Sequence, residues 1–153
     1  MANYNRTLIL PLLKVFLDLI TVETAIALAF YLRFYSPLTA VIPVTKGIPA
    51  LMPYLYFSLI ILAIFVVTLA VFQSYRPHLH FSFSQEVIII FKSCILGILI
   101  AMSAAFWYRD ATYSRAVFLL IFVTALILLL IQRYFYHLLK QLLSRRGHFL
   151  LNI

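Results

Sequence analysis

Four long apolar stretches restrict the fold of this 153-residue sequence more than any other feature. They cover about residues 8–34, 53–75, 86–107 and 115–146. Roughly 20 helical residues are enough to cross the hydrocarbon core of a bilayer. Because lipid offers the backbone no hydrogen-bond partners, such segments cross it as helices. We therefore predict an all-α membrane protein with four transmembrane helices.

The composition argues against a water-soluble alternative. Of all residues, 65% are hydrophobic and 10% are charged, whereas a soluble domain has about 25% charged residues. The connections after the second and third stretches are short, which favours antiparallel neighbours in a bundle. Residues 36–53, between the first two stretches, are rich in proline and predict a loop. The expected domain is an antiparallel four-helix bundle over residues 1–147.

The positive charges predict the orientation of this bundle, because loops on the cytoplasmic side of a membrane collect Lys and Arg. One side of the predicted bundle has Arg6, Lys14, Arg76, Lys92, Arg133, Lys140, Arg145 and Arg146, and the other has Arg33, Lys46, Arg109 and Arg115. We therefore expect a multi-pass protein with both termini in the cytoplasm. We expect these basic residues to interact with membrane lipids and not with nucleic acid.

The fourth stretch is longer than a bilayer requires. Neither glycine nor proline interrupts residues 115–146, which as a helix extend about 48 Å at 1.5 Å per residue. We expect this helix to continue into the cytoplasm and its basic residues to contact the inner head groups. Gly147 is a natural helix stop, and residues 148–153 resemble the first strand of a further cytoplasmic domain. The expected head-group contacts are Arg133, Lys140, Arg145 and Arg146.

The first predicted span contains Lys14, Asp18 and Glu23, and the third contains Lys92. Each costs about 2.5–3.5 kcal/mol near the centre of a membrane, so we expect a polar network that offsets this cost. Lys14 and Asp18 are spaced i, i+4 and are expected to pair on one helix face. Glu23 lies deeper, where a neutral carboxyl group is favoured. Polar contacts between helices explain these residues better than an ion path, because a transporter would have more spans or broken helices.

No residue pattern in this chain predicts catalysis. The four acidic residues are scattered, and no two form an evident acid/base pair. His78 and His80 lack the further ligands of a metal site. The single cysteine, Cys94, excludes an internal disulfide and is expected to be a buried apolar side chain. We expect no cofactor and no metal in this chain.

The most distinctive motif is the turn between the third and fourth stretches. It contains Arg109, Asp110, Tyr113, Ser114 and Arg115. If this turn has only a structural role, one of its acidic or hydroxyl side chains caps the next helix. Arg115 is then expected to anchor at the outer head groups.

With this turn, the chain resembles the N-terminal membrane domain of the large polyisoprenyl-phosphate hexose-1-phosphate transferases. The resemblance rests on the sequence YSRAVFLL followed by a long apolar helix, Arg133 and Gly147. Asp18, the sequence LRFY at residues 32–35 and the sequence FQSYRPH at residues 72–78 agree with it. Ser74 stands where the family usually has glycine.

The resemblance implies a membrane anchor in the inner membrane of a bacterium. In such proteins a Rossmann-like domain follows, and then a catalytic domain that uses Mg²⁺ to transfer a sugar phosphate from a nucleotide sugar to undecaprenyl phosphate. None of those catalytic residues is in this chain. Membrane-bound nucleotide-sugar dehydratases have a similar anchor and are the nearest competitor. An accessory subunit without chemistry, packed as a homodimer or in a larger membrane complex, is a third hypothesis, and a transporter is a fourth.

Overall fold

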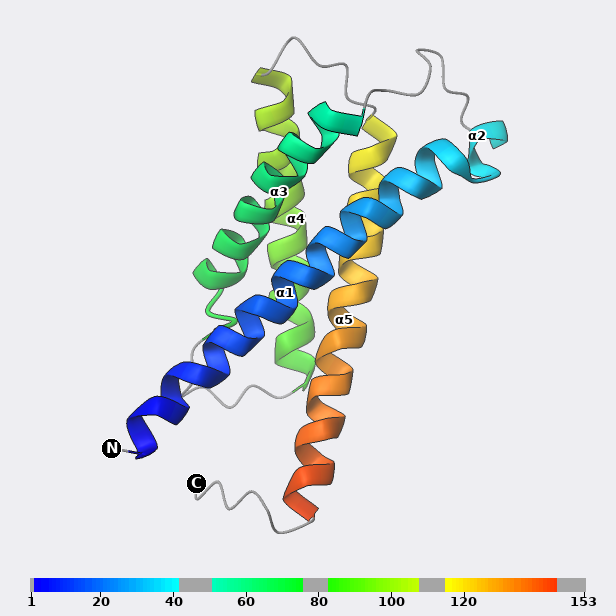
Figure 1. Ribbon diagram of the computed structural model, residues 1–153. Coiled ribbons are helices and arrows are strands. Elements are labelled where there is room, and N and C mark those ends of the chain that lie inside the picture. The colour runs from blue at the N-terminus through cyan, green and yellow to red at the C-terminus, as the bar shows by residue number, and fades with distance from the viewer. Residues whose placement is uncertain (1, 42–50, 76–82, 108–114, 146–153) are drawn as a thin grey trace.

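Figure 1 shows the computed structural model, which describes residues 2–41, 51–75, 83–107 and 115–145. Side chains are described for residues 11–39, 52, 54–75, 83–107 and 115–138. The helices are α1 (Ala2–Tyr35), α2 (Leu38–Val41), α3 (Leu51–Val71), α4 (Phe83–Trp107) and α5 (Arg115–Arg145). The predicted all-α, four-helix fold is confirmed.

Four of these helices are long and apolar enough to cross a membrane. The spanning segments are Pro11–Tyr35, Tyr54–Val71, Phe83–Trp107 and Arg115–Leu138. Many large hydrophobic side chains on all four helices, such as Phe16, Val67 and Leu119, point away from the bundle. An exposed apolar surface of this extent is unfavourable in water and matches hydrocarbon. The expected multi-pass membrane protein is therefore consistent with the structure.

The four long helices form a ring. Helix α1 packs against α5 and α3, and α4 closes the ring between α5 and α3. Figure 1 shows α1 crossing the other long helices obliquely, with the start of α1 and the end of α5 at the same end of the bundle. The core between them is apolar and includes Val22, Ile61, Phe65, Ile90 and Ile121.

Small residues allow α3 and α4 to approach closely. Ser93, Gly97 and Ala101 are spaced by four and are buried on one face of α4. A Cβ atom at Gly97 would lie 3.3 Å from the Phe65 ring and 3.4 Å from the Thr68 hydroxyl. Without a hydrophobic driving force in lipid, such close packing is a main source of helix association.

A hydroxyl group joins α1 to α5 at the middle of the bundle. The side chains of Ala25 and Ala29 on α1 are fully buried. The Thr124 hydroxyl of α5 lies 3.0 Å from the Ala25 carbonyl oxygen, within hydrogen-bond distance. The small alanine side chains leave the α1 backbone accessible to this contact.

Part of the predicted loop at residues 36–53 is helical. The Ser36 hydroxyl accepts a hydrogen bond from the Leu38 N–H at 3.2 Å, and Pro37 follows Ser36 directly. Serine before a helix with proline at its first position is a common helix start. The result is the four-residue helix α2, and residues 42–50 lie outside the described part of the chain.

Helix α3 ends at Val71, four residues before the end predicted from hydrophobicity. Gln73 has a left-handed backbone with φ of 65°. Its N–H donates to the Ala70 carbonyl at 2.9 Å, and the Ser74 N–H donates to the Leu69 carbonyl at 3.0 Å. This is the Schellman motif, in which a left-handed residue closes a helix. The motif turns the chain at Ser74 back toward the bundle.

Gln73→Gly should raise the free energy of unfolding by about 1 kcal/mol, because glycine adopts the left-handed conformation without the penalty of a Cβ atom. Unfolding by SDS titration in mild detergent measures this change. Gln73→Ala is the control and should give no such gain. Equal effects of both variants would contradict the importance of the left-handed backbone.

Candidate functional site

The strongest polar contact of the bundle is a buried ion pair between α1 and α5. Arg133 Nη2 donates to Asp18 Oδ2 at 2.8 Å, and the two side chains are 2% and 0% exposed. Gln132 Nε2 donates to the other carboxylate oxygen of Asp18 at 2.9 Å. Both oxygens of Asp18 are thereby satisfied, as a buried carboxylate requires.

The end of α3 contributes to the same cluster. Arg133 Nη2 also donates to the Ser74 hydroxyl at 3.0 Å. Burial and the nearby Asp18 carboxylate raise the pKa of Tyr75, the next residue. The Schellman motif at Gln73 thus places Ser74 and Tyr75, in the turn after α3, beside the ion pair.

A second ion cluster connects α1, α4 and α5. Lys14 Nζ lies 3.1 Å from Glu86 Oε1, and His137 Nε2 lies 2.9 Å from Glu86 Oε2. Lys14 also lies over the Tyr136 ring, 5.1 Å from its centroid. Glu86 is in the first turn of α4, where the helix dipole favours a negative charge.

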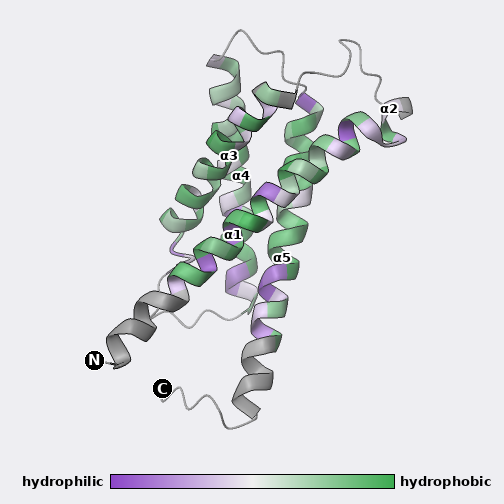
Figure 2. Ribbon diagram, viewed as in Figure 1, coloured by the Kyte–Doolittle hydropathy of each residue, from purple (hydrophilic) through white to green (hydrophobic). Residues whose placement is uncertain are grey.

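These two clusters lie at the end of the bundle where α1 begins and α5 ends. Figure 2 shows hydrophilic positions on α1, α4 and α5 toward this end. We call this end the charged end. It consists of Lys14, Asp18, Ser74, Tyr75, Glu86, Gln132, Arg133 and His137.

The structure changes the partners predicted for the intramembrane charges. Lys14 and Asp18 do not pair with each other as expected. Each pairs instead with a residue of another helix, because α1 packs with these side chains turned toward its neighbours. Glu23 contacts Ser58, 3.1 Å away, and is not part of the charged end. Lys92 is exposed on α4, and no hydrogen bond or ion pair of its side chain is found among the described residues.

The sequence predicts that Arg133 contacts head groups, but the structure places its side chain inside the bundle. Its side chain is buried, because the carboxylate of Asp18 lies within the bundle and draws the guanidinium inward. The side chains of Lys140 and Arg145 lie outside the described part, as do Arg146 and residues 148–153. The outer-turn residues Arg109, Asp110, Tyr113 and Ser114 also lie outside it, and Arg115 is exposed at the start of α5.

Glu86, His137, Ser74 and Gln132 were not predicted as network members. One signal in the sequence was available for Glu86. It is the first residue of the third predicted stretch, and the predicted topology puts it on the same side of the membrane as Lys14. His137 and Ser74 become recognisable only once the packing of the helices is known.

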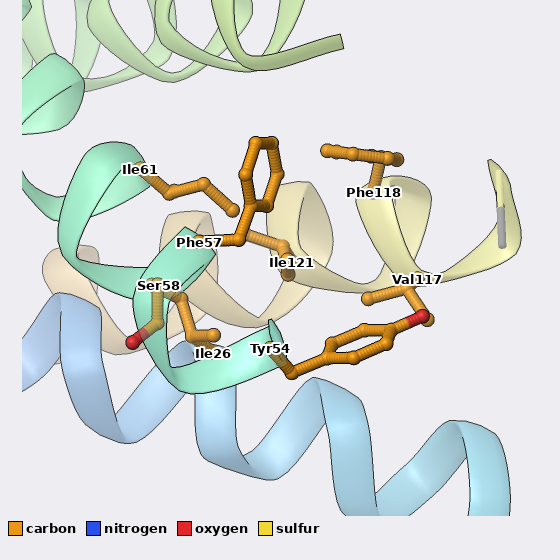
Figure 3. Close-up of a pocket in the computed structure, with 8 residues that line it drawn as sticks. All are labelled: Ile26, Tyr54, Phe57, Ser58, Ile61, Val117, Phe118 and Ile121. Carbon is orange, nitrogen blue, oxygen red and sulfur yellow. The ribbon is translucent and has the colours of Figure 1, made fainter. Parts of the chain in front are cut away.

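A small crevice lies in the other half of the bundle (Figure 3). Its lining is mostly apolar and comes from α1, α3 and α5, and includes Ile26, Phe57, Ser58, Phe118 and Ile121. Its volume of about 10 Å³ is room for roughly one water molecule. This crevice is too small for a substrate, and within the described residues no group of His, Cys, Asp or Glu is arranged to hold a metal ion.

The geometry of the charged end favours a structural role over a catalytic one. Asp18 and Glu86 are each engaged by a cation, so neither is free to act as a general base within the described structure. The contacts connect side chains of α1, α4, α5 and the turn that follows α3. The arrangement can hold the helices in a fixed rotation and depth.

Comparisons of this chain with protein-family models, with curated proteins and with solved structures find no match. The class of protein therefore follows from the fold and the charged end alone. It is a four-helix membrane protein whose helices are connected at one end by one buried and one partly buried ion pair.

Removing one member of the Asp18–Arg133 pair should destabilise the bundle strongly. Arg133→Met leaves the Asp18 carboxylate buried without its cation, and we expect a loss of about 3–5 kcal/mol in the free energy of unfolding. Asp18→Leu should cost a similar amount. The double variant should cost much less than the two single losses together, because it leaves no unpaired charge. SDS titration of the four proteins gives this double-mutant cycle, and additive losses would contradict the coupling.

Lys14 and Lys92 provide a matched comparison of paired and unpaired lysines. Lys14→Leu should lower the free energy of unfolding by about 1–3 kcal/mol, because Glu86 loses a charged hydrogen-bond partner. Lys92→Leu should leave stability unchanged or raise it, since an exposed cation is replaced by an apolar side chain. The same SDS titration measures both. A larger loss for Lys92→Leu than for Lys14→Leu would contradict the assigned contacts.

Proposed function

We propose that this bundle is the membrane anchor of a larger bacterial enzyme, an undecaprenyl-phosphate sugar-phosphate transferase. The observation that carries the anchor role is the charged end, which connects α1, α4, α5 and the turn after α3 through buried and partly buried contacts. An anchor that positions an attached domain at the membrane needs helices in a fixed arrangement, which serve as a rigid base. Buried ion pairs provide that base, because lipid leaves a displaced charge without solvation.

Helix α5 extends this base beyond the membrane. It has 31 residues and continues to Arg145, whereas roughly 20 helical residues cross a bilayer. A continuous helix transmits the position of the bundle to the residues that follow it. In our proposal α5 leads to a cytoplasmic catalytic domain and holds it near the inner leaflet, where a lipid-phosphate acceptor lies.

The orientation is part of the proposal. The charged end faces the cytoplasm, so that both termini are cytoplasmic and the membrane is the bacterial inner membrane. Support comes from the eight basic residues assigned to this side in the sequence, against four on the other. Basic residues near the end of α5 then lie at the level of anionic head groups.

The transferase assignment is supported by the resemblance of the sequence. The motif YSRAVFLL, the arginine at position 133 and the aspartate at position 18 occur in the order expected for that family's membrane domain. The pairing of Arg133 with Asp18 gives these two residues a shared structural purpose. The catalytic domain in this proposal uses Mg²⁺, and the bundle itself contributes no catalytic group.

The proposal predicts the properties of the native protein. An epitope tag placed before residue 1 in the source bacterium should identify a membrane protein much heavier than 17.7 kDa. Membranes containing it should transfer labelled sugar phosphate from a nucleotide sugar to undecaprenyl phosphate, and chelation of Mg²⁺ should abolish the transfer. Membranes from a deletion strain are the control.

Two other results would each replace the proposal. A product near 17.7 kDa that purifies with a different subunit would indicate an accessory subunit. A heavier product that releases a nucleotide-bound keto sugar, with no lipid-linked sugar, would indicate the dehydratase class.

A further inference from the structure

Glu23 differs from the other acidic side chains that the structure describes. Asp18 and Glu86 are each paired with a cation, whereas no ion pair of Glu23 is found among the described residues. Glu23 also lies in the apolar part of α1, well away from both ends of the helix. An ionised carboxylate in hydrocarbon would be poorly solvated, and the described residues give Glu23 no counter-ion.

The Ser58 hydroxyl lies close to two oxygen atoms but has one hydrogen to donate. Ser58 is buried, and its Oγ atom lies 2.9 Å from the Leu55 carbonyl oxygen and 3.1 Å from Glu23 Oε1. A serine hydroxyl has one hydrogen to donate and two lone pairs to accept with. The Leu55 carbonyl oxygen has no hydrogen. If Ser58 donates to Leu55, the contact with Glu23 is a hydrogen bond only when Glu23 supplies the hydrogen.

The second carboxyl oxygen of Glu23 supports the same assignment. Glu23 Oε2 is buried and has no hydrogen-bond partner among the described residues. In a carboxylate this atom would share the negative charge and remain unsolvated, which is very unfavourable. In a carboxylic acid that donates through Oε1, it is a neutral carbonyl oxygen, for which an unmade hydrogen bond costs much less.

We propose that Glu23 and Ser58 form an intramembrane proton-binding site. Glu23 is a carboxylic acid that donates its hydrogen to Ser58 Oγ, and Ser58 donates in turn to the Leu55 carbonyl. Figure 3 shows the Ser58 hydroxyl directed toward α1, while Ser58 itself lines the crevice between α1, α3 and α5. This site is separate from the charged end and does not depend on which enzyme the bundle anchors.

The chain offers a direct test because it contains two glutamates, Glu23 and Glu86. Labelling of glutamate with ¹³C at the side-chain carboxyl gives two signals in solid-state NMR spectra of the protein in lipid vesicles. At neutral pH we expect one signal at the position of a protonated carboxyl and one at that of a carboxylate. Glu86→Gln should remove the carboxylate signal, and Glu23→Gln should remove the protonated one.

Either variant alone assigns both signals, so the test survives if one of them fails to fold. Ser58→Ala is a further variant, and it should shift the protonated signal, because Glu23 loses its acceptor, and leave the Glu86 signal in place. Two carboxylate signals in the unmodified protein would overturn the proposal. Assignment of the protonated signal to Glu86 would overturn it as well.

Discussion

The buried ion pair between Arg133 and Asp18 is the contact on which the arrangement of α1 and α5 depends. In water a separated charge is solvated again, but in hydrocarbon it is not. Packing arrangements of α1 and α5 that separate the two charges are therefore very unfavourable. Successive residues of a helix point about 100° apart, since one turn contains 3.6 residues. A rotation of α1 by one residue would therefore turn Asp18 away from Arg133. The pair fixes both the rotation and the depth of the two helices.

The other contacts follow from this constraint. With α1 oriented by Asp18, Lys14 one turn earlier lies toward Glu86 of α4, and Ala25 lies toward Thr124 of α5. The opposite end of the bundle is held differently, by aromatic contacts such as that between Phe30 and Tyr54, whose ring centroids are 5.0 Å apart. Such contacts tolerate small changes in geometry better than a buried ion pair does. One end of the bundle is therefore more strictly specified than the other.

The sequence predicts the helices well because their length and hydrophobicity are properties of one segment at a time. It predicts the pairs between charges poorly because these depend on how the segments pack. Lys14 and Asp18 are well spaced for a local pair, yet interhelical contacts with Glu86 and Arg133 replace it. The end of α3 shows the same limit. The sequence predicts a second stretch that reaches Tyr75, whereas the left-handed backbone at Gln73 ends the helix at Val71.

The positions of the polar groups also bear on function. A buried ion pair seldom adds net stability compared with well-packed apolar residues, because removing two charges from water is so costly. If the helices only had to hold the protein in the membrane, an apolar bundle without ion pairs would be sufficient. This protein instead places its ion pairs toward the end of the bundle where α5 ends (Figure 1). Contacts that define geometry more than stability are useful where the orientation of a helix end matters, and this is the support that the charged end gives to the proposed anchor role.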